Sequence, residues 1–441
     1  MCNGSIMDKL ISFSLPLMVS GILQLAFNAV DIIVVGRFSG SQALAAVGST
    51  TALINVFTNL FIGISLGANV LAARFYAAGK DREMSETVHT SITLALISGI
   101  MMAVIGVLLA KWALEIMGTP DDVIGQSALY MRIYFMGMPF FMLYNYGAAI
   151  LRAIGDTKRP LIFLIISGIA NAALNMILVI LFHMGVAGVA IGTIISQLIS
   201  CVLVLTCLYR SEGSYQLRFS KLKINGAYME QIFQVGVPAG IQSTVINFSN
   251  VLLQSSVNSF GSTAMAGYTA ANNLLGFLYA SVNSVTQACM SFTSQNYGVG
   301  KFKRMDRVLI DCALISVVFA GTLGTIFYVF GSEILQIYTK DPEVIKAGME
   351  IISITTIPYF LCGIMDLFPG AMRGMGRSGV PMILSIIGTV GTRIVWIYGI
   401  FPLHRSLFVL FISYPGSWLI TIAMQVICFF IVRKQVRERY M

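Results

Sequence analysis

The sequence predicts an all-α polytopic membrane protein, with twelve transmembrane helices arranged as two parallel-repeat six-helix bundles. Its composition, its long stretches without charge and an internal repeat predict this fold. Of 441 residues, 57% are hydrophobic and 11% are charged, and the mean hydropathy is +0.83. Soluble domains carry about 25% charged residues. The composition therefore indicates many membrane crossings.

Apolar segments of spanning length occur along the whole chain, since a helix needs roughly 20 apolar residues to cross a bilayer. The stretches 231–300 and 160–209 contain no Asp, Glu, Lys or Arg. Each of these stretches holds two spans. The predicted spans are 11–35, 44–73, 88–110, 128–150, 160–182, 186–208, 231–258, 267–297, 309–330, 347–370, 380–402 and 406–432.

The positive charges favour one orientation. The net charge is +9, and 21 of the 28 Lys and Arg residues fall in the termini and the even-numbered loops. By the positive-inside rule, these segments face the cytoplasm. We expect a multi-pass protein of the cell inner (cytoplasmic) membrane with both termini cytoplasmic, in contact with the lipid bilayer and with no nucleic-acid partner.

Short motifs recur along the chain at one constant offset of 221 residues. GSQALA at 40–45 recurs as GSTAMA at 261–266, FYAAGK at 75–80 as NYGVGK at 296–301, and LRAIGDTKRP at 151–160 as MRGMGRSGVP at 372–381. Because each copy holds an even number of spans, the copies share one orientation. We predict an N-terminal lobe at 1–210, a cytoplasmic linker at 211–228 and a C-terminal lobe at 229–441. Such repeats place the substrate near the midplane and rock one half against the other.

The first span carries one carboxylate, Asp31, and one proline, Pro16. An aspartate at the centre of a span costs about 2.5 to 3.5 kcal/mol on insertion scales and normally marks an ion or substrate path. Gln24, Asn28 and Asp31 lie at steps of four and three, on one helical face. This face is predicted to be wet or to contact protein.

Polar stripes run along other spans. The seventh span includes Asn247 and Asn250, and the eighth includes Asn283 and Gln287. Hydrogen bonding between helices is the alternative interpretation. Because the stripes run the length of a span, we favour a shared solvated cavity and assign Gln24, Asn28, Asn283 and Gln287 to a substrate cavity.

Asn171 and Asn175 share one face of the fifth span, and Thr193 is a hydroxyl in the sixth. Together with Asp31 they offer the oxygen ligands that a hard monovalent cation needs, whereas Asp31 alone offers a proton site. Asp366 is the other acid deep in a span. It is either functional or a structural partner of Arg393.

Several classes of chemistry are excluded. The seven cysteines contain no CxxC pair and the three histidines have no ligand spacing, so we expect no transition-metal site. No phosphate-binding GxxxxGK[ST] loop occurs. An intramembrane aspartyl protease built on Asp31 and Asp366 would need YD and GxGD motifs, but the flanks read VD and GIMD. The sequence therefore predicts no enzyme and no cofactor.

These features together resemble the multidrug and toxic compound extrusion (MATE) family of cation-coupled exporters. The resemblance covers nearly the whole chain and rests on the first-span proline, aspartate and glycine (Pro16, Asp31, Gly36), the GSQALAA loop and the RAIGDTKRP loop. It implies that Asp31, Asn171, Asn175 and Thr193 form a cation site and that the first helix bends at Pro16.

The resemblance also implies a candidate site in the C-terminal lobe. Asp366 matches the aspartate that family members use in the tenth span. The acid expected in the seventh span is missing, because Glu230 lies at the cytoplasmic start of that span. Asn247 and Asn250 are the remaining polar candidates there.

The function implied is antiport, in which Na+ or H+ moving inward drives the export of organic cations. The alternative is a lipid-linked sugar flippase of the wider superfamily. A flippase would need several intramembrane cations to receive a pyrophosphate, and Arg132 and Arg393 are the candidates.

Overall fold

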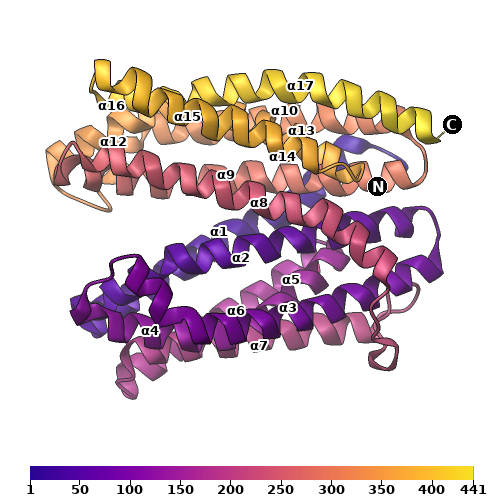
Figure 1. Ribbon diagram of the computed structural model, residues 1–441, viewed down its shortest axis with the longest axis horizontal. Coiled ribbons are helices and arrows are strands. Elements are labelled where there is room, and N and C mark those ends of the chain that lie inside the picture. Colours follow the sequence, from indigo (N-terminus) through magenta and orange to yellow (C-terminus); the bar gives the residue numbers. More distant parts are fainter. Residues whose placement is uncertain (441) are drawn as a thin grey trace. The chain divides into compact units, whose positions relative to one another are not determined.

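Helices account for nearly all of the protein (Figure 1). The computed structural model describes residues 1–440, and the side chains of all of these except Ser41, Ala52, Arg439 and Tyr440. Among the described residues there is no strand. The chain forms two compact units: unit 1 is Met1–Ile22 with Ile241–Met441, and unit 2 is Leu23–Gly240.

Unit 2 is built from the first half of the chain. After α1 (Ile6–Phe38) come α2 (Gly40–Ala77), α3 (Asp81–Ile116), α4 (Asp121–Met136), α5 (Met138–Ala153), α6 (Lys158–Met176), the π-helix η1 (Ile177–Leu181), α7 (Gly185–Arg210) and the 3₁₀ turn η2 (Phe219–Lys221).

Unit 1 is built from the second half. After α8 (Gly226–Asn258) come α9 (Ser262–Gly298), α10 (Phe302–Val329), α11 (Gly331–Leu335), α12 (Pro342–Thr355), α13 (Tyr359–Gly374), α14 (Gly379–Ser385), the π-helix η3 (Ile386–Gly391), α15 (Thr392–Val395), the π-helix η4 (Trp396–Ile400), the 3₁₀ turn η5 (Phe401–Leu403), α16 (Leu407–Phe411) and α17 (Ser413–Tyr440).

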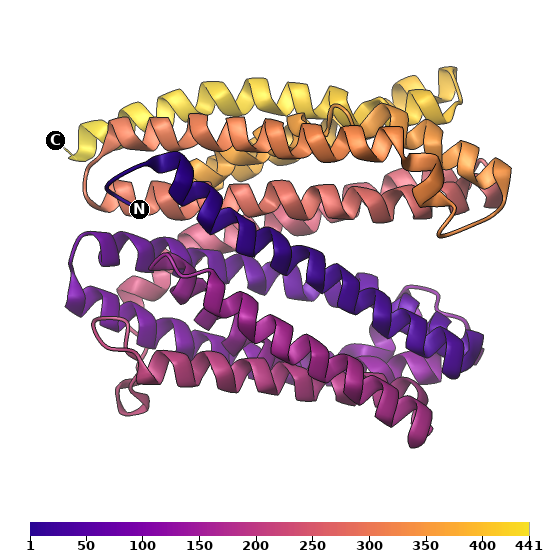
Figure 2. The ribbon, with the colours of Figure 1, turned by 180° about the vertical axis from the view of Figure 1, so that it is seen from behind.

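Two helices contribute to both units. α1 belongs to unit 1 up to Ile22 and to unit 2 from Leu23, and α8 belongs to unit 2 up to Gly240 and to unit 1 from Ile241. Figure 2 shows α1 as one unbroken helix. The predicted lobes, 1–210 and 229–441, follow the order of the chain, whereas these units follow contacts. The lobe boundaries stay predictions.

The repeat found in the sequence extends to the ends of the helices. Asp81, the first residue of α3, lies one repeat offset before Phe302, the first residue of α10. The same offset relates the first residues of three further pairs of helices: α4 and α12, α5 and α13, and α6 and α14. α5 and α13 also end at equivalent residues, Ala153 and Gly374. The same helix pairs pack in each copy: α2 contacts α3, α4 and α5, and α9 contacts α10, α12 and α13. The two copies therefore share one fold.

Paired glycines mark the turns of this repeat. Gly79 and Gly300 have φ of 65° and 69°, in the left-handed region that favours glycine. Gly40 and Gly261, and Gly155 and Gly376, are further pairs with positive φ at the same offset. The motifs recur because both copies need the same backbone turns.

The first part of α8 joins unit 2 through close backbone contact with α2. Gly63 and Gly67 face Gly236 and Gly240, and a Cβ added at Gly63 would lie 2.3 Å from the backbone N of Gly240. Two facing GxxxG segments allow this approach, as is common between membrane helices. Larger side chains at these positions would separate the helices.

The twelve predicted spans each correspond to one helix or to a broken helix. Among the described residues, eight helical segments are long and apolar enough to cross a membrane by themselves, and the pair α12 and α13, bent by 50°, makes a ninth. The predicted span 128–150 covers parts of α4 and α5, which are separated by Gly137, while α8 and α9 are long but carry the polar stripes. Pro358, between α12 and α13, lacks an N–H for a helical bond, which explains why 347–370 is not one straight helix.

Candidate cation site

Four residues predicted from the sequence meet within unit 2. Asp31 comes from α1, Asn171 and Asn175 come from successive turns of α6, and Thr193 comes from α7. Asn171 and Asn175 are buried, with 8% and 0% of their surface exposed, while Asp31 and Thr193 are half-buried. The site therefore lies between three helices.

A chain of hydrogen bonds connects these side chains. Asn175 Nδ2 donates to Asp31 Oδ1, and also to Asn171 Oδ1 at 2.8 Å. Asn171 Nδ2 in turn lies 3.4 Å from Thr193 Oγ1. The carboxylate is thus linked to the hydroxyl through two amides.

Ser196 is a fifth member that the sequence analysis missed. Its Oγ accepts from Asn171 Nδ2 at 3.3 Å. Ser196 lies three residues after Thr193, on the same face of α7, and this spacing was the signal available in the sequence.

Glycines make room for the cluster. A Cβ at Gly192 would lie 2.3 Å from Asn175 Oδ1, and a Cβ at Gly168 would lie 1.9 Å from the ring of Phe27. Gly168 therefore lets α1 approach α6, and Gly192 leaves space for the amide of Asn175. The same Asn175 Oδ1 is buried and has no hydrogen-bond partner among the described residues.

The donor set consists of one carboxylate, two amides and two hydroxyls. Such hard oxygen donors suit cations like Na+ rather than soft transition metals. Among the described residues, no group of three or more His, Cys, Asp or Glu side chains could hold a metal ion. The chemistry of the cluster fits a monovalent cation or a proton on Asp31.

The candidate site in the C-terminal lobe is arranged differently. Asn250 Oδ1 accepts from Arg393 Nη1 at 2.8 Å, and Asn247 is exposed. Asp366 is half-buried in α13 and interacts electrostatically with Arg373. No hydrogen bond joins Asp366, Asn247 and Asn250 among the described side chains. Their joint role stays a prediction.

Asp366 and Arg393 are not an ion pair. The ion pairs found among the described residues do not include Arg393. The guanidinium instead bonds to neutral oxygens of α8. The structural role considered for Asp366 as a direct partner of Arg393 is therefore wrong.

The residues predicted for the substrate cavity fall in both units. Gln24 and Asn28 belong to unit 2 and are exposed, while Asn283 and Gln287 belong to unit 1 and are half-buried. A cavity shared by these four residues stays a prediction.

The bend predicted at Pro16 also stays a prediction. α1 continues as α-helix through Pro16. The carbonyl oxygen of Pro16 accepts from Ser20 Oγ at 2.8 Å. This side-chain hydrogen bond links Pro16 to the next turn of α1.

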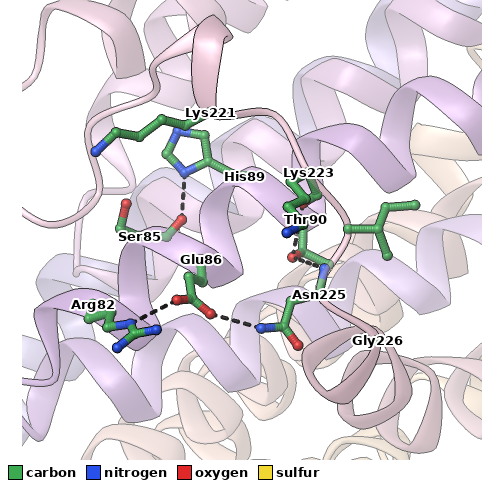
Figure 3. A pocket seen from close by; sticks show the side chains of 10 residues that line it. Arg82, Ser85, Glu86, His89, Thr90, Lys221, Lys223, Asn225 and Gly226 are labelled. Carbon is green, nitrogen blue, oxygen red and sulfur yellow. Dashed lines mark hydrogen bonds and ion pairs between the residues drawn. The ribbon is translucent and has the colours of Figure 1, made fainter.

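A second feature of unit 2 is a cavity of about 670 Å³ between the start of α3 and the linker (Figure 3). Basic side chains from both segments line it, among them Arg82, Lys221 and Lys223. Asn225 Nδ2 donates to Glu86 Oε2 at 2.8 Å.

His89 and Thr90 fix the same part of the linker to α3. His89 Nδ1 donates to the Ser85 carbonyl at 2.6 Å, and His89 Nε2 accepts from the Arg218 N–H at 3.1 Å. Thr90 Oγ1 accepts from the Asn225 N–H at 3.1 Å. These partners require a neutral His89 ring with its proton on Nδ1. These bonds fix the linker to α3 within unit 2.

Comparison with known proteins gives consistent matches over both copies. The family model described as MatE matches residues 16–177 and 238–398. The chain is 30% identical to the probable multidrug resistance protein YoeA of Bacillus subtilis (strain 168), covering 87% of this chain and 84% of that protein. It is 26% identical to the multidrug export protein MepA of Staphylococcus haemolyticus (strain JCSC1435), covering 88% and 86%.

A solved structure has the same fold. It is the outward-facing conformation of a multidrug resistance MATE family transporter of the MOP superfamily, with a TM-score of 0.88 at 18% identity. The match covers 98% of this chain and 96% of that one. The twelve-helix fold predicted from the sequence is confirmed.

Proposed function

Because the chain belongs to the MatE family, we propose that it is a secondary active multidrug efflux transporter. It exports organic compounds, mostly cationic and amphipathic, in exchange for Na+ or H+. The membership confirms the resemblance noted in the sequence. The matched relatives are named as resistance and export proteins, and the matched structure is a transporter rather than an enzyme.

The cluster around Asp31 supports ion coupling. A half-buried carboxylate is joined to the amide of Asn175, and Asn175 Oδ1 is a buried acceptor without a partner among the described residues. A cation bound by these oxygens would complete their coordination, and a proton on Asp31 would remove the charge. Either event changes the electrostatics of the same site.

Antiport follows if the ion and the exported compound favour different states of the lobe. Cation or proton binding neutralises Asp31 and favours one conformation, while an organic cation favours the other. The carboxylate can be neutralised by one partner at a time. Their differential binding is the coupling free energy.

The membrane orientation belongs to the same proposal. The loops rich in Lys and Arg face the cytoplasm, together with both termini, and the protein lies in the cytoplasmic membrane. Export is then movement away from the side on which the basic linker lies.

The alternative, a lipid-linked sugar flippase, has less support. A pyrophosphate group in the membrane requires several cations around it. Of the two candidate arginines, Arg132 is exposed, whereas Arg393 is 3% exposed and held by its own neighbours.

The test is efflux of ethidium from cells that lack their own pumps, with sodium and pH varied separately. We expect efflux by the parent protein and its near-complete loss in Asp31→Asn, because the variant cannot carry the coupling charge. Asp8→Asn is the matched control, since Asp8 is an exposed acid at the start of the same helix. The response of the parent to sodium or pH identifies the driving ion.

Two results would count against the proposal. A well-expressed parent without efflux would argue against this class of substrate. Efflux by Asp31→Asn equal to that of the parent would remove Asp31 from the mechanism.

A further inference from the structure

The internal repeat places different chemistry at the equivalent positions of the two copies. The offset is the one that relates Gly40 to Gly261, and it is one position longer for the first helix of each copy, where Pro16 corresponds to Pro238. The residues equivalent to Asp31, Asn171, Asn175 and Thr193 are Leu253, Thr392, Trp396 and Tyr414. The second copy has lost the carboxylate and both amides.

Arg393 occupies this region of unit 1. It follows Thr392 directly and is 3% exposed. Its Nη1 donates to Ser249 Oγ at 3.1 Å and to Asn250 Oδ1 at 2.8 Å. These partners lie on α8, the helix equivalent to α1.

An aromatic ring completes the surroundings of this guanidinium. The Arg393 Cζ atom lies 4.2 Å from the centroid of the Tyr414 ring. Tyr414 is the counterpart of Thr193 and stacks on Phe411, with ring centroids 5.8 Å apart. A ring face at this distance attracts a cation. Arg393 therefore connects the same three structural positions in unit 1 that the amides of α6 connect in unit 2.

No acid neutralises Arg393 directly. It forms no ion pair among the described residues, and residues 231–300, which include most of α8 and α9, contain no acid. Its Nε is buried without a hydrogen-bond partner there. The charge is held by neutral oxygens and a ring, which is the environment of a bound cation rather than of a salt bridge.

The backbone around Arg393 is irregular in a way that matches unit 2. The π-helices η3 and η4 flank the single turn α15 that carries Arg393. In unit 2 the π-helix η1 begins two residues after Asn175. π-helical segments inside α-helices occur frequently at functional sites. Both copies therefore have irregular helices where a cation is expected.

We propose that Arg393 is a built-in cation. Its guanidinium occupies, in the second copy, the position that the Asp31 cluster provides for an exchangeable cation in the first. Ser249, Asn250 and Tyr414 are the ligands of this tethered ion. It follows that the C-terminal lobe binds no coupling ion of its own, a consequence that rests on the proposed function.

The test removes the tethered cation and supplies a free one. The part of the side chain that Arg393→Ala removes corresponds to ethylguanidinium. This ion is therefore added while the variant is solubilised and purified, and the melting temperature is measured with and without it. We expect a fall on the order of 5 °C in Arg393→Ala, with at least half recovered by ethylguanidinium. Arg405→Ala is the control, because Arg405 is an exposed arginine 5.8 Å from the Phe401 ring centroid.

The partners provide a second check on the same protein. Adding Asn250→Ala to Arg393→Ala should abolish the recovery, because a ligand of the ion is then missing. A folded Arg393→Ala that loses no stability, or that ethylguanidinium does not stabilise beyond its effect on Arg405→Ala, would overturn the proposal.

If Arg393→Ala does not fold, Arg393→Lys and Arg393→Gln replace it. Lysine keeps the charge and glutamine keeps a neutral hydrogen-bond donor. We expect the lysine variant to melt at the higher temperature, and the reverse order would contradict a cation at this position. These measurements need no transport, so they stand even if ethidium efflux fails.

Discussion

The two copies of the repeat share a scaffold but differ in the charge at their centres. In unit 2, the carboxylate of Asp31 is held by Asn175. In unit 1, the guanidinium of Arg393 is held by Ser249 and Asn250. Helix boundaries, packing partners and left-handed glycines recur at one offset. Backbone geometry is therefore retained in the two copies although the charged side chains differ.

The signs of these charges suit different tasks. An acid can gain and lose a cation or a proton, whereas an arginine keeps its charge at any physiological pH. A site centred on Asp31 can therefore cycle, and a site centred on Arg393 is fixed. One lobe provides the variable element and the other a constant one.

Among variants that separate the two copies, Asn175→Ala is expected to have the largest effect. The variant removes the amide that donates to Asp31 Oδ1, and we expect transport to fall roughly 10- to 100-fold, as for residues that orient a ligand. Ethidium efflux measures it. Asn145→Ala is the control, because the amide of Asn145 donates within its own helix, to the Phe141 carbonyl at 2.8 Å. Equal activities of the two variants would contradict the role of Asn175.

Next in size is Gly192→Ala in the first copy. Its Cβ would lie 2.3 Å from Asn175 Oδ1. We expect the variant to lose about 1–3 kcal/mol in stability, typical of overpacking, and to lose most of its transport activity. The second copy carries Ser413 at the equivalent position, where no such amide is present. Gly125→Ala, with nothing within 4 Å of its Cβ, should melt like the parent. A tolerated Gly192→Ala would show that Asn175 is not held in place.

A test in the opposite direction introduces an acid into the second copy. Leu253 is fully buried and lies on the same face of α8 as Ser249 and Asn250. Leu253→Asn buries a polar group at a cost of about 1–3 kcal/mol. We expect Leu253→Asp to cost less, because Arg393 attracts its charge. Melting temperatures measure the stability of both variants, and a lower value for the aspartate variant would contradict an attraction between the introduced acid and Arg393.

The smallest effects concern the shared scaffold. Gly79→Ala and Gly300→Ala place a Cβ at φ of 65° and 69°, and we expect each to cost about 1–2 kcal/mol. Chemical denaturation or thermal melting should show similar losses for the pair. Gly321→Ala is the control, within α10 and without atoms within 4 Å of its Cβ. Clearly unequal losses at Gly79 and Gly300 would show that the copies have diverged in their turns.

Much of the first site was predictable from its residues. Asp31 is conspicuous because acids are costly in a span, and the spacing of Asn171 and Asn175 places them on one face. Thr193 was a candidate hydroxyl that the family resemblance supported. Ser196 was missed although its spacing from Thr193 is helical.

The second site was less predictable. An intramembrane arginine suggests an acidic partner, so Asp366 was considered for Arg393 instead of the neutral oxygens of α8. Applying the repeat offset to Thr193 would have pointed to Tyr414. The π-helices around Arg393 depend on hydrogen-bond register, which side-chain patterns do not encode. The break at Pro358 was readable only as a proline inside a long apolar segment.

The sharing of α1 and α8 between the units has a consequence for synthesis. Residues 23–240 form unit 2 and leave the ribosome as one continuous stretch. Unit 1 contains Met1–Ile22, which are made before unit 2, but the rest of it is residues 241–441, which are made after unit 2. Domains generally fold as units during translation. The segment Met1–Ile22 is therefore synthesised before the whole of unit 2, and its partners in unit 1 are made only afterwards.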